Sequence, residues 1–289
     1  MAQNSIVVVG LPGSGKTTFL AALWHLVFGR EMPIKMELHN IARGNQTHLN
    51  AIADRWLRAE VQDRTDVGGD QVVSLNLLDE KKHPVQITFP DVAGEVFSQM
   101  WEQRECEPDA AEMLRNGNVL LFINAPRIQA PHWVHELSQQ VAALGGGVDE
   151  PDEEPVSWDP KLAPTQVQLV GLLTMLSEFP LDSGPRKLCV ILSAWDKARG
   201  EGLVPAAFLE AKLPLLNQYL QTNSAQWEWQ VYGVSAQGGD YDDKAAGKPG
   251  NVEAAELRKI NNPAERIFLT LDGKTSSHDL TIPIGWLTT

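Results

Sequence analysis

Cysteine, basic clusters and long apolar runs are all scarce in this sequence of 289 residues. Its two cysteines, Cys106 and Cys189, stand in no metal-ligand spacing and give no reason to expect disulfides, which fits a reducing compartment. The first residues show no basic region followed by an apolar stretch, so a secretory signal is not indicated. Apolar segments such as residues 167–176 are too short and interrupted to span a bilayer. We therefore expect a cytoplasmic protein without a membrane span.

The charge balance is acidic, with a formal net charge of -13. Non-specific nucleic-acid binding requires clustered positive charge, and the sequence has no Lys/Arg run of that kind, so no nucleic-acid partner is expected. Because the overall field repels anions, a phosphate-binding site would have to be built from local features.

Alternating apolar runs and helical periodicity predict the fold class. The β-branched run at residues 5–9 is typical of a strand buried on both faces of a parallel sheet. A polar stretch at 79–83 between two apolar runs predicts one antiparallel hairpin. Strands are expected at residues 5–9, 72–78, 84–89, 119–124, 187–193 and 230–235, and helices at 17–28, 50–61, 108–114, 131–144, 165–179 and 206–220. The segments on either side of 50–61 are expected to be irregular. Together these elements predict a three-layer, doubly wound α/β fold, mostly parallel, with one antiparallel edge strand.

We expect a single domain over residues 1–289 with surface insertions. Residues 145–164 are rich in Gly, Pro and acids and predict a flexible insertion, and residues 238–251 predict a second polar loop. The apolar terminal segment 281–287 is expected to be the last element of the core, with a docking segment for a partner as the alternative.

The strongest local signal is Gly10-Leu-Pro-Gly-Ser-Gly-Lys-Thr17, between the first strand and the first helix. Glycines permit close approach of the backbone, and amides at a helix N-terminus bind phosphate oxygens. Lys16 would supply a charge to the β- and γ-phosphates, and the Thr17 hydroxyl would bind Mg²⁺. A chance glycine-rich turn is the alternative, with odds of about one in a hundred from average composition. The expected nucleotide-contacting residues of this loop are Gly10, Gly13, Ser14, Gly15, Lys16, Thr17 and Thr18.

An acidic residue follows the strand expected at 84–89. Asp91 would stand at the carboxyl end of that strand, where ligands of open α/β sheets bind, and is expected to hold the magnesium shell. Gly94 could offer its amide to the γ-phosphate because no side chain blocks the approach. An ordinary Asp-x-x-Gly turn is the alternative.

With these motifs the sequence resembles the Ras-like, translation-factor-related family of P-loop GTPases. Asp91-Val-Ala-Gly94 matches the family's Asp-x-x-Gly segment, Ser193-Ala-Trp-Asp196 occupies the place of its Asn-Lys-x-Asp motif, and Ser235-Ala-Gln237 resembles its Ser-Ala motif. The resemblance implies a P-loop NTPase fold with GTP or GDP and Mg²⁺ as cofactors. It also implies that Asp196 accepts hydrogen bonds from guanine N1 and N2 and that the Ala236 amide, beside Ser235, donates to O6.

The base-reading motif departs from the family pattern. Ser193 and Ala194 replace the usual Asn and Lys, and Trp195 or Lys197 could supply the stacking that this lysine stem provides. Read without the resemblance, Asp196 is an acid at a helix N-terminus.

The expected catalytic group consists of Lys16, Glu95 and Arg64. Glu95 stands where many family members carry a glutamine that orients water, so hydrolysis without a partner is expected to be slow; a solvent-facing acid is the alternative. Lys16 and Asp91 are 75 positions apart, which indicates an insertion in the first switch. Thr65 is the expected magnesium-sensing threonine, with Thr47 as the other candidate, and Arg64, or else Arg58, is the candidate arginine finger, against the alternative of a solvated surface arginine.

Within the family, Phe89 to Glu95 and Ser193 to Lys197 are similar to bacterial GTPases of the double-GTPase group, encoded beside other GTPase-related proteins in predicted conflict systems. One set of motifs is visible, so a second GTPase domain would belong to another chain. The resemblance implies a magnesium-dependent, GTP-hydrolysing molecular switch that signals to a regulatory or effector protein, or to another GTPase chain. Two alternatives stay open: a nucleotide-loaded interaction module with little or no hydrolysis, and an ATP-binding P-loop ATPase or kinase.

Overall fold

The computed structural model of the chain describes residues 4–44, 46–62, 72–90, 94–115, 117–131, 159–243 and 250–289. Eight strands of this described part form one sheet in the order β2-β3-β4-β1-β5-β6-β7-β8. Their bounds are β1 (Asn4–Val9), β2 (Glu37–Arg43), β3 (Val73–Leu78), β4 (Pro84–Phe89), β5 (Asn118–Asn124), β6 (Arg186–Ser193), β7 (Trp227–Ser235) and β8 (Phe268–Thr270).

The centre of the sheet is parallel and both edges are antiparallel. β4, β1, β5, β6 and β7 pair in parallel, whereas β2–β3, β3–β4 and β7–β8 are antiparallel. The mostly parallel α/β class is thus confirmed, with more antiparallel pairing than the single predicted hairpin. The expectation of an irregular segment before the second helix was wrong, because β2 lies there. Its sequence, Glu-Leu-His-Asn-Ile-Ala-Arg, is largely exposed at the sheet edge and has no apolar alternation.

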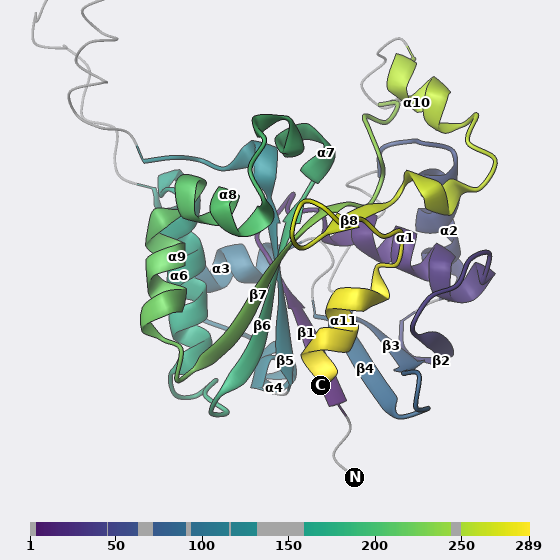
Figure 1. Cartoon of the computed structure of the whole chain (residues 1–289). Coiled ribbons are helices and arrows are strands. Elements are labelled where there is room, and N and C mark those ends of the chain that lie inside the picture. The colour runs from purple at the N-terminus through teal and green to yellow at the C-terminus, as the bar shows by residue number, and fades with distance from the viewer. Residues whose placement is uncertain are drawn as a thin grey trace, which may run out of the picture.

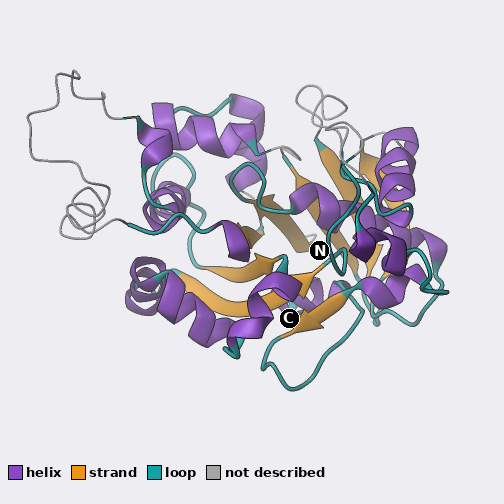
Figure 2. Ribbon diagram, turned by 90° about the horizontal axis from the view of Figure 1, so that it is seen from above, coloured by secondary structure: helices purple, strands orange, loops and turns teal. Residues whose placement is uncertain are grey.

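Helices cover both faces of the sheet, which gives the three layers seen in Figures 1 and 2. One face carries α1 (Lys16–Gly29), α2 (Gln46–Leu57) and α11 (Thr281–Thr288), and the other carries α3 (Glu95–Gln103), α4 (Pro108–Arg115), α6 (Thr165–Ser177), α8 (Pro205–Lys212) and α9 (Pro214–Thr222). The short helices α7 (Trp195–Ala198) and α10 (Val252–Leu257) lie beyond the upper edge of the sheet in Figure 1. The remaining short elements are η1 (Ala125–Arg127), η2 (Pro160–Leu162), η3 (Arg199–Glu201) and η4 (Pro263–Arg266).

The core is divided by the sheet into two apolar clusters. Ile6 and Val8 of β1 belong to one cluster and Val7 and Val9 to the other, as the alternation of side chains along a strand requires. This two-sided burial explains why β1 is a continuous β-branched run rather than an alternating one.

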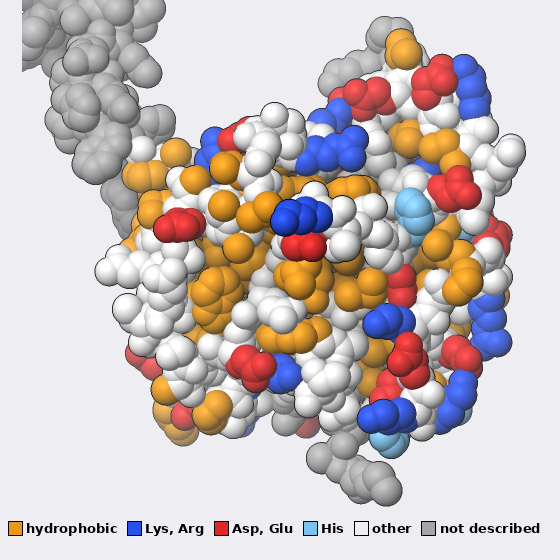
Figure 3. All heavy atoms as spheres, in the orientation of Figure 1, with side chains coloured by type: hydrophobic (Ala, Val, Ile, Leu, Met, Phe, Trp, Pro, Cys, Tyr) orange, Lys and Arg blue, Asp and Glu red, His pale blue; other side chains and the backbone are white. Residues whose placement is uncertain are grey.

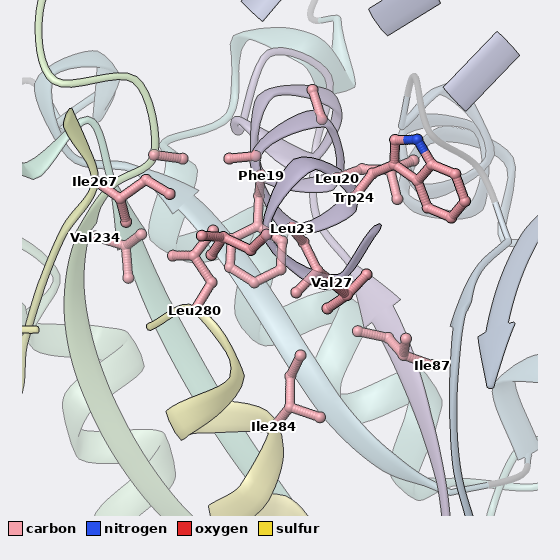
Figure 4. Packing of buried hydrophobic residues seen from close by; sticks show 14 of the residues in the cluster. Phe19, Leu20, Leu23, Trp24, Val27, Ile87, Val234, Ile267, Leu280 and Ile284 are labelled. Carbon is pink, nitrogen blue, oxygen red and sulfur yellow. The ribbon is translucent and has the colours of Figure 1, made fainter. Parts of the chain in front are cut away.

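The terminal apolar segment completes one of these clusters. Figure 4 shows Phe19, Leu23 and Val27 of α1 gathered with Leu280 and Ile284 of the C-terminal segment. Leu280 and Ile284 are fully buried, so this segment is part of the core.

The predicted insertions fall largely outside the described residues. Of 145–164 only the part from 159 onward is described, and of 238–251 the residues 244–249 are not. The helix expected at 131–144 also lies outside the described part beyond residue 131. None of the helices in the described ranges is both long and apolar enough to cross a bilayer. On the face in Figure 3, basic and acidic side chains are interspersed rather than gathered by sign.

Candidate functional site

The phosphate loop joins β1 to α1 and has the backbone geometry that its glycines predict. Gly13 and Gly15 adopt φ values of 71° and 96°, in the left-handed region that favours glycine. A Cβ on Gly10 would lie 2.7 Å from Ser14 Oγ and 2.9 Å from the Phe122 carbonyl oxygen. The loop therefore packs directly against β5 and turns tightly into α1, and a side chain at Gly10 would force it outward.

Lys16 is held at the start of α1 by the loop itself. Its side chain is only 2% exposed, and Nζ donates to the carbonyl oxygens of Gly10 at 2.7 Å and Leu11 at 3.1 Å. The ammonium also lies 5.8 Å from the centre of the Phe97 ring. These contacts fix a positive charge inside the loop, beside the N-terminus of α1, where the helix dipole favours an anion.

A pocket of about 640 Å³ opens at this edge of the sheet. That volume is within the range usual for small-molecule sites. The structure brings together most of the residues predicted from the sequence, since the pocket lining includes Gly13, Ser14, Gly15, Lys16, Thr17, Thr18, Asp196, Lys197 and Ala236. Two further predicted residues adjoin this lining: Gly10 begins the phosphate loop, and Ser235 is the last residue of β7, next to Ala236.

The end of β6 is tied to the phosphate loop through Ser193. Its hydroxyl donates to the Ser14 carbonyl oxygen at 2.6 Å, and the side chain is buried. A Cβ on Gly15 would lie only 2.8 Å from Ser193 Oγ, so the two loops are in direct contact. Ser193 thus connects the loop that carries Asp196 with the loop that carries Lys16.

Asp196 has a buried oxygen without a donor. Its Oδ1 is shielded from solvent and accepts no hydrogen bond from the described residues, although the side chain lines the pocket. A buried acceptor without a partner costs free energy, so such an atom indicates a place where a ligand donor would be favourable.

The two candidates for stacking on a base are both engaged elsewhere. Trp195, one of the two alternatives, is buried in the core, edge-on to Phe208 at 5.3 Å between ring centres. The Lys197 ammonium bonds Glu253 at 2.8 Å and Asp240 at 3.2 Å. The hydrogen bond to Glu253 raises the pKa of Lys197 and in return lowers the pKa of Glu253. Lys197 still lines the pocket, but its charge holds the polar loop and α10.

The loop after β7 is held on two sides. Ser235 Oγ accepts a hydrogen bond from the Gly238 amide at 3.0 Å. The Ala236 carbonyl oxygen accepts one from the indole Nε1 of Trp56, in α2, at 2.7 Å. These bonds shape the segment from which the Ala236 amide was expected to meet a base.

On the phosphate side, Gly94 touches the lysine. It adopts φ 94°, and a Cβ there would collide with Lys16 Nζ and lie 2.8 Å from the Gly10 carbonyl oxygen. Glu95 follows as the exposed first residue of α3. Asp91, Arg64 and Thr65 lie outside the described residues.

The substitutes proposed for the last two residues are both on the surface. Thr47 is exposed in the first turn of α2. Arg58 is exposed and pairs with Glu60 at 3.5 Å.

With this geometry in place, the sequence matches the family described as Double-GTPase 1 over residues 7–287. The chain belongs to this family. Membership supports GTP binding and assigns the chain to the GTPases. No curated protein matches the sequence.

Several solved structures are similar to this GTPase. The GTP-bound GTPase-like domain of Ski7 from S. cerevisiae is 14% identical, covers 82% of this chain and 43% of its own, and has a TM-score of 0.43. The Arl6 BBS3 small GTPase from Trypanosoma brucei is 12% identical over 82% of this chain and 88% of its own, with a TM-score of 0.38. A bacterial selenocysteine-specific elongation factor, EF-Sec, is 11% identical over 82% of this chain, with a TM-score of 0.36. This chain spans only 27% of the length of that factor.

The structure of this GTPase adds site residues that the sequence motifs did not reveal. At the end of β5, Asn124 Nδ2 donates to the Gly13 carbonyl oxygen at 2.9 Å. Arg127 follows in η1, with its guanidinium beside Gly13, 3.5 Å from where a Cβ would be. Their position was the available signal, because Asn124 is the last residue of the buried parallel strand β5 and Arg127 lies three positions later, at the sheet edge where the other motifs lie.

The insertion after α1 also reaches the pocket. Residues 60–62, which follow α2, line it, and Val61 donates its amide to the Asp242 carbonyl oxygen at 2.9 Å. The insertion and the polar loop therefore meet as one wall of the pocket, which no local sequence pattern indicates.

Proposed function

We propose that the chain is a magnesium-dependent switch that binds and hydrolyses GTP and signals to a partner protein. The observation that supports this best is Asp196, which lines the same pocket as Lys16 and whose buried Oδ1 has no hydrogen-bond donor within the described part of the chain. Guanine presents N1–H and the 2-amino group on one edge, both donors suited to a carboxylate. Adenine presents an acceptor at N1 and no carbonyl for the Ala236 amide, so this arrangement favours guanine.

In this proposal the phosphates occupy the end of the pocket formed by the loop and α1. Lys16 and the loop amides offset the charge of the phosphates, which the protein's overall negative charge would otherwise repel. Mg²⁺ needs only one or two protein oxygens together with phosphates and water, and the half-buried hydroxyl of Thr17 in the pocket lining suits that role. Asp91 and Thr65 are the other proposed ligands. When bound, Mg²⁺ would neutralise charge on the β- and γ-phosphate oxygens.

Hydrolysis consists of attack by water on the γ-phosphorus while its bond to the β–γ bridging oxygen breaks, which releases GDP, inorganic phosphate and a proton. Lys16 stabilises the charge that develops, and the Gly94 amide would contact the γ-phosphate, a role that the close approach of Gly94 to Lys16 supports. Glu95 would accept a hydrogen bond from the attacking water, and Arg64 would add positive charge. Because a carboxylate also repels the γ-phosphate, we propose that turnover is slow until a partner protein supplies further groups.

The partner belongs to the same proposal. A regulatory or effector protein, or another GTPase chain, would bind the segments around Thr65 and around Asp91 to Glu95, which GTP and Mg²⁺ would order. We further propose that the switch works in the bacterial cytoplasm, within a conflict system.

A nucleotide-loaded module with little hydrolysis is the second candidate. It is favoured by one observation, since Glu95 is exposed at the beginning of α3. Multiple-turnover phosphate release separates the two: appreciable magnesium-dependent turnover by the protein alone would exclude the non-hydrolysing module.

The first experiment identifies the nucleotide that copurifies with the protein, by denaturation and chromatography, beside a Lys16→Ala control. GDP or GTP, lost in the control, is expected. Recovered adenine nucleotide would overturn the guanine assignment, and an empty protein would be titrated with each nucleotide in the presence of Mg²⁺.

A further inference from the structure

We propose that Trp56 is a positioning residue for guanine recognition, acting through the backbone of Ala236. The inference rests on the proposed function, because it assumes that the loop after β7 meets guanine O6. It extends that function to a side chain in α2, a helix of the insertion that carries no nucleotide-binding motif.

The bond between Trp56 and the loop is short and fully shielded. Indole Nε1 donates to the Ala236 carbonyl oxygen at 2.7 Å, the Trp56 side chain is 0% exposed, and the two residues are 180 positions apart. A carbonyl fixed in this way fixes the conformation of Ala236 and therefore the direction of the neighbouring amides. A second bond lies within the loop, from the Gly238 amide to the Ser235 hydroxyl, and we call these two bonds the anchors of the loop.

Trp56 is itself held in place by a buried arginine. The Arg266 guanidinium lies 5.6 Å from the centre of the indole ring, and its Nη1 donates to the carbonyl oxygens of Trp56 at 3.2 Å and Leu57 at 3.0 Å. These are the last carbonyls of α2, which have no partner within the helix. The His25 ring packs on the indole, 5.1 Å away. The indole therefore has one defined orientation, with its N–H aimed at the loop.

The same end of α2 is bonded to the polar loop by backbone contacts. Asp242 donates its amide to the Ala59 carbonyl oxygen at 2.9 Å and accepts from Val61. In addition, Arg258 of the segment after α10 donates to the Arg58 carbonyl oxygen at 2.8 Å. Residues 60–62 and 236–237 line the same pocket. The end of α2 is therefore fixed to the part of the site where the base is proposed to bind, and not only to the core.

A positioning role predicts an effect that depends on the ligand, whereas a purely structural role does not. The test compares Trp56→Phe with the wild type after removal of copurified nucleotide, using GDP, 6-thio-GDP and IDP. Phe keeps an aromatic ring and loses the N–H donor. 6-Thio-GDP replaces the O6 acceptor with a weakly accepting sulfur, and IDP lacks only the 2-amino group that Asp196 would read.

We expect Trp56→Phe to weaken GDP binding about threefold to tenfold, the effect of one hydrogen bond. Binding of 6-thio-GDP should change by less than about twofold, and the preference for GDP over IDP should stay the same. The matched control is Trp24→Phe: Trp24 is also buried and loses one indole bond at 2.9 Å, but that bond goes to Asn50 Oδ1 in α2 rather than to the loop after β7.

Equal loss for all three ligands, as in any loosened core, would overturn the inference, and so would unchanged GDP binding. Failure of the wild type to bind guanine nucleotide would instead overturn the proposed function, and this inference with it. If thermal melting shows that Trp56→Phe does not fold, Ser235→Ala removes the other anchor of the loop. It should give the same ligand-selective loss, and a Ser235→Ala protein with full selectivity would contradict anchoring of the loop by side chains.

Discussion

We expect Asp196→Asn to change the base preference of the pocket from guanine to xanthine. The carboxylate is the group proposed to accept from both donors on the guanine edge. An Asn of the same shape offers one carbonyl acceptor and turns an NH₂ group toward the other donor. Xanthine carries a C2 carbonyl where guanine carries its 2-amino group, so it presents an acceptor to that NH₂.

The size of the effect follows from the position of the carboxylate. Asp196 Oδ1 is buried and has no donor among the described residues, so a bond from guanine would form away from water. Hydrogen bonds to a charged acceptor contribute about 1.5–3 kcal/mol each. In the variant, one of the two proposed bonds from guanine would be lost, and the Asn NH₂ group would face a guanine donor in its place. We therefore expect a loss of about 3–4 kcal/mol, or two to three orders of magnitude in GDP affinity. The nucleotide-free variant should lose no stability, because Oδ1 accepts no hydrogen bond from the described part of the chain that the substitution could remove.

The assay is a titration of nucleotide-free protein with GDP and XDP, followed by thermal melting of the free protein. Asp240→Asn is the matched control: Asp240 lines the same pocket and the substitution removes the same charge, but its carboxylate pairs with Lys197. Its affinity ratio for GDP and XDP should remain that of the wild type. If Asp196→Asn kept its GDP affinity, or if Asp240→Asn shifted the preference equally, Asp196 would not read the base.

Three further predictions concern single residues. Gly94→Ala should lower GTP affinity at least tenfold, as measured by isothermal titration. A φ of 94° alone costs a non-glycine residue about 1–2 kcal/mol, and the new Cβ would collide with Lys16 Nζ. Wild-type affinity in this variant would contradict the close approach of Gly94 to Lys16. Arg127→Ala should weaken GTP binding about threefold to tenfold at low salt and less at 1 M salt. The reason is that salt screens the charge of an exposed guanidinium such as this one beside Gly13. An equal loss of affinity at both salt concentrations would contradict a charge effect. Burial lowers the pKa of His25, against the opposing effect of Glu31, so the free energy of unfolding should fall as the pH drops below 6.5. In His25→Gln, the free energy of unfolding measured with urea should depend less steeply on pH between 7.5 and 5.5. The same pH dependence in the variant and the wild type would refute this prediction.

The parts of the site that could be predicted are those fixed by local sequence. A buried β-branched run, a glycine-rich loop and a helix predict the position of Lys16 at the start of α1, because each step depends on neighbouring residues. Asp196 and Ala236 follow neighbouring parallel strands, β6 and β7, whose carboxyl ends share one edge of the sheet. The sequence therefore indicates which motifs lie at the same edge of the sheet, but it does not give the distances between them.

Features that depend on tertiary contacts were not predictable in the same way. The helix expected at 206–220 is two helices, since Pro214 begins α9 and its ring cannot follow an unbroken turn. β2 is a strand because β3 offers it a partner, not because of its own pattern. The hydrogen bond between Trp56 and Ala236 joins positions 180 residues apart, and no local sequence pattern in either segment predicts it.

The departure from Asn-Lys in the base-reading motif has a physical explanation in the same contacts. Ser193 spans the gap to the Ser14 carbonyl oxygen with a 2.6 Å bond, which is possible only because Gly15 presents no side chain to it. A longer side chain at 193 would have to displace the phosphate loop, so the short hydroxyl and the close approach of the loops require each other. Ala194 ends this link at φ 51°, the turn that begins α7 and brings Asp196 into the pocket. Ser193 therefore joins the end of β6 to the phosphate loop through a short side chain.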